Sequence, residues 1–342
     1  MVRSRRYNNY RGRRSKGKTA LAVLLILVIL AAIVVILLQR HIIYDETGAP
    51  RMEVPWKDEA REEASSEPAL DLVIRPPEKT VAEIRGFRLP VGTLTREGYD
   101  SVMAAVEPAY NAVAVVLKDE NGTVYFDADA AVSGSVDTAE DTSDVLAALT
   151  GGQLRAIAEI SCFRDPKAAG ADVDGMGLED TAGYIFYDGA NQQWLDPAKP
   201  AARRYVCELA VEAAKLGFHE ILLTDLGYPT DGKLEQIAYG EAEKSENLKL
   251  FLEELRSALE PYGTVITVEV SADVITTGQQ EASGQKLTEI AAAADRICAA
   301  ASPEEAAGFF EALKEATEEA VPFVPLLAGY DSTLTGSYLV IE

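Results

Sequence analysis

Hydrophobic and polar positions change their spacing many times after residue 80. Short apolar runs, typical of buried strands, alternate with longer segments in which apolar residues recur every three or four positions, as on one face of a helix. The predicted strands are 83–90, 111–118, 155–163, 220–225, 264–271, 295–300, 321–328 and 337–341. The predicted helices are 97–107, 143–149, 198–216, 246–260, 285–293 and 303–319. Strands that alternate with helices in this way predict an α/β fold.

A closed barrel explains this pattern better than an open sheet. Eight strands with interleaved helices in about 260 residues match a TIM (β/α)8 barrel in number and in size. The rival is a doubly wound open sheet, but the chain contains no GxGxxG motif and no phosphate-binding loop to support it. We therefore expect a TIM barrel over residues 81–342.

The stretch 194–229 shows the pattern most completely. Asp196 is the predicted N-cap of a helix, and Pro197 suits its first turn. An amphipathic helix follows and ends near a glycine, and a short apolar strand comes next. Asp225 then begins the loop at the carboxyl end of that strand. In a TIM barrel the chemistry lies at this end of the strands.

The N-terminal part has a different composition. Residues 1–18 carry eight Arg or Lys and no acid, and residues 19–38 contain no charge. A run of this length spans about 30 Å of hydrocarbon, so we expect a single-pass transmembrane helix at 19–38 behind a basic cytoplasmic tail. No convincing cleavage site follows Leu38, which favours an anchor over a signal peptide. Residues 39–80 are charged and contain five prolines, and we interpret them as a flexible stalk. The barrel would then be extracytoplasmic, on the outer side of the cell membrane.

Charge and cysteine content exclude several function classes. The net charge is −23, and without the basic tail the remainder is near −31. Such a domain lacks the basic footprint of a nucleic-acid-binding protein. Its three cysteines form no CxxC or Cys/His cluster, so we expect buried thiols and no structural zinc. No cofactor motif is present, and the acid-rich loop 171–180 is either a solvated loop or a calcium site.

Several motifs resemble one family of bacterial exported and membrane-anchored barrels. That family shows a pattern like W-x-(D/N)-P…Y…A-x-E-A…G-F-D-E-I-x-F-D-Y-I-R-F-P. The matching positions here are Trp194, Asp196, Pro197, Tyr205, Ala210, Glu212, Ala213, Gly217, Phe218, Glu220, Ile221 and Pro229. Further matches are Asn111-Ala112-Val113, Lys118-Asp119, Phe163-Arg164-Asp165-Pro166, Gly284-Gln285 and Asp295. The chain thus resembles the uncharacterised glycosyl-hydrolase-like domain family (DUF4015-like), as a divergent member, over roughly 83–300.

The resemblance implies a glycoside-hydrolase-like TIM barrel, but this chain departs from the family at polar positions. In ungapped register the family's strand-four aspartate falls on Thr224, its tyrosine on Asp225 and its arginine on Gly227. The strand-two aspartate falls on Val116 and the strand-three arginine on Glu159. These departures put catalysis in doubt.

Asp225 and Glu269 are the candidate catalytic residues. Because strand side chains alternate faces, a shift by one residue should turn Asp225 away from the barrel interior unless a bulge, or Gly227 in the turn, brings it back. On the fifth predicted strand Thr267, Glu269 and Ser271 alternate with an apolar face, so Glu269 should point into the barrel near its mouth. Two carboxylates on neighbouring strands suit the separation that glycoside hydrolysis requires.

Other residues are candidates for substrate binding. The insertion 164–193 follows the third strand, and Tyr187 and Trp194, with Tyr184 and Phe186, either stack on sugar rings or only hold the loop down. Asp331 follows the seventh strand and could line the same mouth.

Lys118 is a further candidate, and strand alternation pairs it with Glu159 on the neighbouring strand. We expect an interior ion pair between the two, the alternative being two solvated charges at the rim. His219 precedes the fourth strand at the opposite end of the barrel, where a catalytic role is not expected.

The sequence supports two functions and leaves a third open. One is a glycoside hydrolase that acts on cell-envelope or extracellular polysaccharide, with Glu269 as general acid or base and Asp225 as nucleophile or charge stabiliser. The other is a degenerate barrel, a pseudoenzyme that binds glycan or a partner protein without cleaving it. A purely structural surface protein is the third reading, and it lacks positive support.

Overall fold

The computed structural model describes residues 42–44, 50–52, 81–317, 321–330 and 335–341. The chain divides into two compact units, Met1–Val73 and Ile74–Glu342. In the first unit, strands β1 (Ile42–Tyr44) and β2 (Pro50–Met52) pair antiparallel. Both strands lie within residues 39–80, for which the sequence predicted a flexible stalk and no strand. The predicted transmembrane segment 19–38 lies outside the described residues, and none of the helices that the structure describes is long and apolar enough to cross a membrane.

The second unit is a closed parallel barrel, as the sequence predicts. The strands follow one another around it in the order β3-β4-β5-β6-β7-β10-β11-β12, and β12 closes against β3. Their bounds are β3 Arg85–Leu89, β4 Ala112–Lys118, β5 Arg155–Ser161, β6 Glu220–Thr224, β7 Val265–Glu269, β10 Arg296–Ala300, β11 Phe323–Leu327 and β12 Tyr338–Val340. Each of the eight lies within its predicted range.

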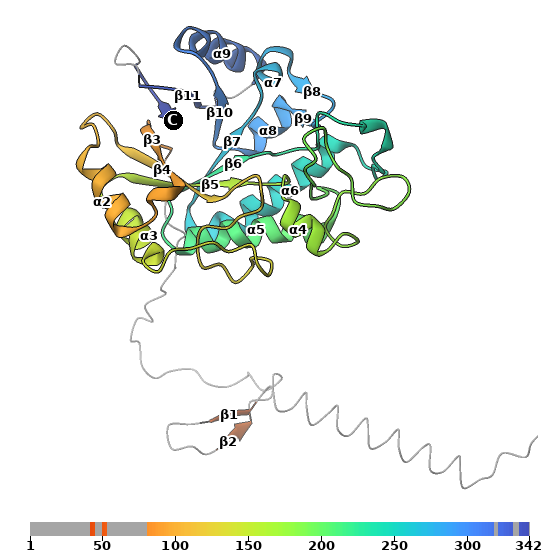
Figure 1. Ribbon diagram of the computed structural model, residues 1–342, viewed down its shortest axis with the longest axis horizontal. Coiled ribbons are helices and arrows are strands. Elements are labelled where there is room, and N and C mark those ends of the chain that lie inside the picture. Colours follow the sequence, from red (N-terminus) through yellow and green to blue (C-terminus); the bar gives the residue numbers. More distant parts are fainter. Residues whose placement is uncertain (1–41, 45–49, 53–80, 318–320, 331–334, 342) are drawn as a thin grey trace, which may run out of the picture. The chain divides into compact units, whose positions relative to one another are not determined.

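Helices cover the outside of this barrel (Figure 1). The predicted helices are confirmed as α2 Arg96–Ala104, α3 Thr142–Thr150, α5 Pro200–Lys215, α6 Lys244–Leu259, α8 Leu287–Ala293 and α9 Pro303–Ala316. They succeed one another counterclockwise in Figure 1.

Several short elements were not predicted. They are α4 (Pro166–Ala171), α7 (Ala272–Thr277), the 3-10 helices at 91–93, 234–236 and 260–262, and an antiparallel pair made of β8 (Gln279–Gln280) and β9 (Gln285–Lys286). Most of them lie in loops after barrel strands, where a few residues are too short for periodicity to show. These loops build the mouth of the barrel.

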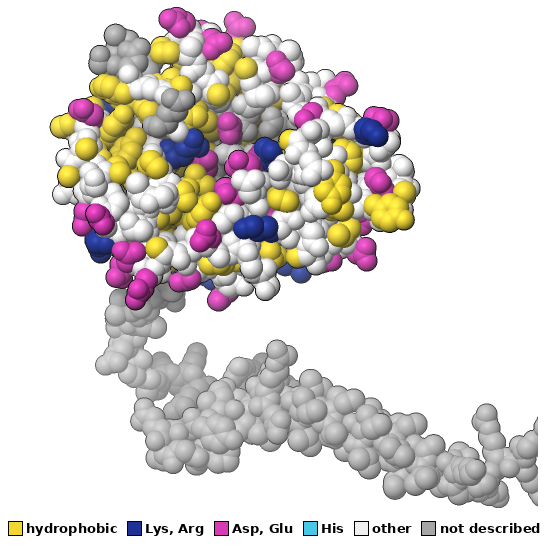
Figure 2. Space-filling model, in the orientation of Figure 1, with side chains coloured by type: hydrophobic (Ala, Val, Ile, Leu, Met, Phe, Trp, Pro, Cys, Tyr) yellow, Lys and Arg dark blue, Asp and Glu magenta, His cyan; other side chains and the backbone are white. Residues whose placement is uncertain are grey.

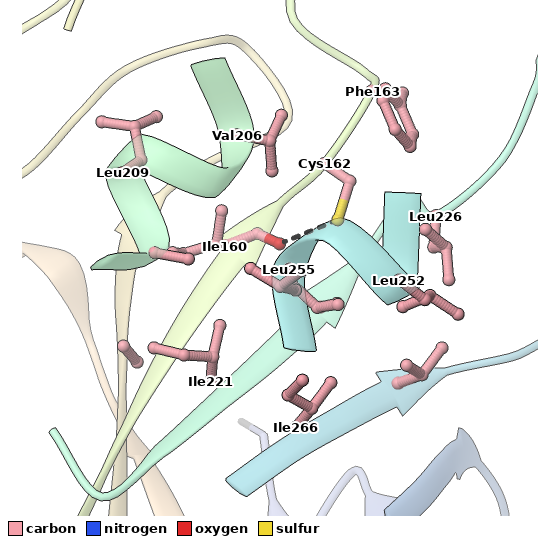
Figure 3. Close-up of a cluster of buried hydrophobic side chains, with 14 of the residues drawn as sticks. Ile160, Cys162, Phe163, Val206, Leu209, Ile221, Leu226, Leu252, Leu255 and Ile266 are labelled. Carbon is pink, nitrogen blue, oxygen red and sulfur yellow. Dashed lines mark hydrogen bonds between the residues drawn. The ribbon is translucent and has the colours of Figure 1, made fainter. Parts of the chain in front are cut away.

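The layer between strands and helices holds the main hydrophobic core. Ile160 and Ile221 point outward from β5 and β6 toward Leu209 of α5 and Leu255 of α6 (Figure 3). All four side chains are fully buried. Burying a side chain of this size contributes roughly 1.5–3 kcal/mol, so this layer supplies much of the fold's stability.

The start of α5 differs from the prediction. The helix begins at Pro200, its N-cap is Lys199, and no side chain caps it. Asp196 instead accepts a hydrogen bond from the amide of Ala198 at 2.9 Å, and the Lys199 amide donates to the Asp196 carbonyl. The aspartate therefore closes a tight turn ahead of the helix, which is the alternative use of a short polar side chain.

A buried polar cluster closes the opposite end of the barrel. Glu220 accepts from the guanidinium groups of Arg155 (2.9 Å) and Arg296 (3.0 Å), and Thr267 donates to it at 2.5 Å. His219 lies at this end too, where its Nδ1 accepts from the amide of Ala156 at 3.2 Å. Partial burial is the main cause of the lowered pKa of His219, and the positive charge of Arg155 lowers this pKa further. Glu220, Thr267 and Arg296 are buried and fill this end of the barrel, whereas His219 is exposed.

Candidate functional site

Two carboxylates meet at the mouth of the barrel, where β6 and β7 end. Glu269 is the last residue of β7 and, on strand alternation with Thr267, faces the barrel interior. Asp225 follows the last residue of β6 and accepts a hydrogen bond from the hydroxyl of Ser161 at 2.8 Å. Ser161 is the last residue of β5 and is itself buried. Three neighbouring strands thus carry this part of the site.

The backbone of Asp225 explains how its carboxylate reaches the mouth. Asp225 has φ 48°, one of two positive values among the described residues other than glycine. This left-handed conformation reverses the direction that simple alternation gives, so the side chain turns toward Ser161 instead of the helix layer. This conformation does what a bulge, or a turn loosened by Gly227, could also have done. Asp tolerates this region better than most residues, and such backbone strain is concentrated at functional sites.

Both carboxylates line one cavity of about 470 Å³, which we call the acid cavity. Its lining residues are Trp194, Asp225, Leu226, Gly227, Tyr228, Thr230, Glu269, Val270, Ser271, Ala272, Gln280, Ser283, Gln285 and Ala300. No Lys, Arg or His belongs to this lining among the described residues. In the orientation of Figure 1, Figure 2 shows a central hollow with acidic side chains inside it and basic ones near its edge.

The environment of Glu269 favours the protonated acid. Burial raises its pKa most, the charges of Glu159 and Asp225 raise it further, and Arg88 opposes them weakly; the result is a pKa of about 7. In the described part of the chain, the Glu269 carboxylate has no hydrogen bond or ion pair. A half-buried carboxyl group of this kind is a proton donor at neutral pH.

The environment of Asp225 is mixed. Burial raises its pKa, whereas the hydrogen bond from Ser161 and the charges of Arg164 and Lys118 lower it. A hydroxyl that donates to a carboxylate stabilises its ionised form. Asp225 therefore has local support for a negative charge that Glu269 lacks. On balance burial prevails and the pKa of Asp225 is raised, but the Ser161 hydroxyl and the two positive charges oppose this rise.

The predicted ion pair between Lys118 and Glu159 is wrong. The ammonium group of Lys118 lies 3.0 Å from a carboxylate oxygen of Asp165 and donates to the Ser161 carbonyl at 2.6 Å. The pairing of β4 with β5 shifts between Val116 and Lys118, so that Val116 lies opposite Glu159 and Lys118 lies opposite Ile160, out of the regular alternation. Lys118 is fully buried and has both partners, so it holds β4 to the loop after β5, and it also forms part of the wall of a second cavity beside Glu159.

Glu159 pairs with Arg88 of β3 instead. The Arg88 guanidinium lies 3.0 Å from Glu159 and also donates to the Ile341 carbonyl at 2.6 Å. Burial raises the pKa of Glu159, and Arg88 opposes this rise. These residues line a second cavity of about 380 Å³, with Tyr125, Glu120, Asp119 and Thr224 among its other walls.

The aromatic candidates separate in the structure. Trp194 lines the acid cavity, and its indole Nε1 donates to Asp188 at 2.9 Å. Tyr187 is 47% exposed, contacts Gln193 through its hydroxyl at 2.7 Å, and does not line that cavity. Tyr184 is more exposed still, whereas Phe186 is buried. Only Trp194 therefore lies beside the two carboxylates.

Within the described residues, the lining of the acid cavity includes neither a cysteine nor a metal-binding cluster. Asp331 lies outside the described residues. In the ranges that the structure describes, no group of three or more His, Cys, Asp or Glu side chains is arranged to hold a metal ion. Cys162, Cys207 and Cys298 are free and buried, and burial raises the pKa of each.

Sequence reasoning missed three groups that shape the site. Ser161 lies two residues after Glu159 on β5, so both side chains face the same side of the strand. Strand alternation could therefore have predicted that Ser161 lies at the mouth of the barrel. Tyr228 lines the acid cavity, and Asn247 of α6 donates to its hydroxyl at 2.9 Å. Gln285 lies on the short β9, and the motif Gly284-Gln285 was the one signal that pointed to it. A contact between loops is not visible in a single sequence.

Comparison with known families agrees with this architecture. A family model described as "Putative glycosyl hydrolase domain" (DUF4015) matches residues 95–323, which is more than half of the chain. The chain belongs to this family. No match was found among curated proteins.

Solved structures show a similar fold. The glycoside hydrolase domain of PgaB (BpsB) from Bordetella bronchiseptica is 16% identical, with 72% of this chain and 84% of that one covered and a TM-score of 0.52. A hypothetical protein from Ruminiclostridium thermocellum is 24% identical, with 53% and 96% covered and a TM-score of 0.48. The GH20 exo-β-N-acetylglucosaminidase from Vibrio harveyi is 14% identical, with 74% and 42% covered and a TM-score of 0.48. The PgaB domain supports the barrel fold.

Proposed function

We propose that this chain is a membrane-anchored, extracytoplasmic glycoside hydrolase that acts on cell-envelope or extracellular polysaccharide. The observation that carries the proposal is the acid cavity, in which Glu269 and Asp225 share one space without a neutralising cation in its described lining. Membership of a glycosyl-hydrolase family supports the substrate class. The anchor is the apolar run 19–38.

The two carboxyl groups take different roles in this mechanism. Glu269, with a pKa of about 7, protonates the oxygen of the glycosidic bond as the C–O bond breaks. The Asp225 carboxylate faces the positive charge that develops on the sugar, either as a nucleophile or by electrostatic stabilisation. A water molecule then attacks the same sugar carbon and gives its proton to the Glu269 carboxylate, which restores the acid and releases Asp225. The Ser161 hydroxyl holds Asp225 in place for this role.

A second cavity beside the first supports a polymeric substrate. Thr224 and Ser161 line the second cavity, and Asp225, which contacts Ser161, lines the acid cavity. Both volumes fall in the range of about 300–1,000 Å³ that is typical of ligand pockets. Trp194 offers an aromatic surface on which a sugar ring of the polymer can pack.

One observation favours a second function. Thr224 ends β6 and lines the mouth at the position where the resemblance puts the family's strand-four aspartate. A barrel that has lost this acid would bind glycan or a partner protein without cleaving it. The same residues would then form a binding surface instead of an active site.

An assay of sugar release separates the two functions. The full-length chain, purified in mild detergent, is incubated with peptidoglycan and a panel of polysaccharides, and released reducing ends are measured. The hydrolase predicts release that Glu269→Gln and Asp225→Asn each abolish. Exposed Glu253→Gln on α6 is the matched control. Glycan binding without any release selects the binding module.

A further inference from the structure

The hairpin of β8 and β9 lies against both loops that carry the acid pair. The amide of Tyr228 donates to the Ser283 carbonyl at 2.9 Å. A Cβ atom on Gly227 would lie 2.9 Å from that same carbonyl oxygen, so only glycine allows this approach. The residues directly after Asp225 are therefore packed on the hairpin.

One side chain of the hairpin reaches both loops at once. The Nε2 atom of Gln285 donates to the Leu226 carbonyl at 2.9 Å and approaches the Glu269 carbonyl at 3.5 Å. Leu226 is the neighbour of Asp225, and the second carbonyl belongs to Glu269 itself. Gln285 is 8% exposed, so water does not readily replace these contacts. The first contact is a good hydrogen bond and the second is a weak one.

The hairpin is itself fixed from the other side. The ammonium group of Lys244, at the start of α6, donates to the Ala282 carbonyl at 2.9 Å and lies 4.1 Å from the ring centre of Tyr239. A Cβ atom on Gly284, which has φ 78°, would lie 2.5 Å from the Lys244 Cβ. Gln285 therefore projects from a segment that Lys244 holds in place. From this fixed position its side chain can hold the backbones of Leu226 and Glu269.

We propose that Gln285 is a positioning residue that sets the relative placement of Asp225 and Glu269. The inference rests on the proposed function, because it assigns Gln285 a part in preparing that acid pair. It acts through the backbone of both loops and does not touch the reacting atoms.

The test measures the titration of Glu269 and needs no substrate. Gln285→Met keeps a side chain of similar volume and removes the amide donor, so the chain should still fold. When the loops separate, water reaches Glu269 and Asp225 moves away from it. We expect its titration midpoint, followed by carboxyl NMR in the full-length chain in detergent, to move down from about 7. The shift should be on the order of one pH unit.

Gln280→Ala is the matched control. Gln280 belongs to the same hairpin and lines the same cavity, but its side chain makes no hydrogen bond within the described residues. It should leave the Glu269 midpoint unchanged. An unchanged midpoint in a folded Gln285→Met variant would overturn the proposal, as would an equal shift in both variants. If only the proposed hydrolase function is wrong, no sugar is released, but Gln285→Met still shifts the titration midpoint of Glu269.

Discussion

Replacing Glu269 with glutamine should stabilise the fold above neutral pH. The ordinary pKa of a glutamate is 4.5, and the folded chain raises that of Glu269 to about 7. At about 1.36 kcal/mol per pH unit, the unfavourable charge costs the folded state about 3 kcal/mol. Glutamine resembles the protonated acid in shape and does not ionise, so it does not bear this cost.

The sign and the pH window follow from the two pKa values. Below pH 4.5 the side chain is protonated in both states, and wild type and Glu269→Gln should differ little. Between pH 4.5 and about 7 the unfolded chain releases the proton that the folded chain keeps, so the stability of the wild type falls as the pH rises. Above that window the variant should be more stable by about 3 kcal/mol.

Urea unfolding of both proteins at pH 4 and pH 8, followed by tryptophan fluorescence, measures this difference. Glu253→Gln, an exposed change on α6, serves as the control and should show no comparable gain. A Glu269→Gln variant that is no more stable than wild type at pH 8 would refute the burial and charge repulsion that we assign to Glu269.

Three further predictions follow from the other contacts of the site. Ser161→Ala removes the donor to Asp225, so the pKa of Asp225 should rise further, and NMR titration of its carboxyl group checks this. Lys118→Met leaves the Asp165 charge buried without its partner and should cost about 3–5 kcal/mol in urea unfolding, much of which Lys118→Met/Asp165→Asn should recover. Asp225→Gly removes the left-handed strain at φ 48° and should raise Tm slightly while abolishing sugar release; a lower Tm would contradict the strain.

The barrel could be predicted from sequence because its signals are local. A few residues of sequence are enough to recognise an apolar strand such as β6 or an amphipathic helix such as α5. The inward direction of Glu269 followed in the same way, since alternation along β7 needs no knowledge of other strands. At these positions the spacing of apolar and polar residues was sufficient to predict the structure.

The finer features of the site depend on contacts that pattern does not contain. The left-handed φ of Asp225 decides where its carboxylate points, and alternation assumes an extended backbone. The partner of Lys118 depended on a register irregularity, so the charged pair was assigned to the wrong acid. Gln285 contacts Leu226, which lies 59 positions away in the chain, through packing between loops.

The pH dependence of polysaccharide cleavage tests the central claim most directly. If Glu269 is the general acid, the rate of reducing-end release by the full-length chain should fall as the pH rises through about 7, where that side chain loses its proton. Glu269→Gln should abolish release over the whole range. Release that continues undiminished well above pH 7, or that survives Glu269→Gln, would contradict the assignment of Glu269 and Asp225 as the acid pair.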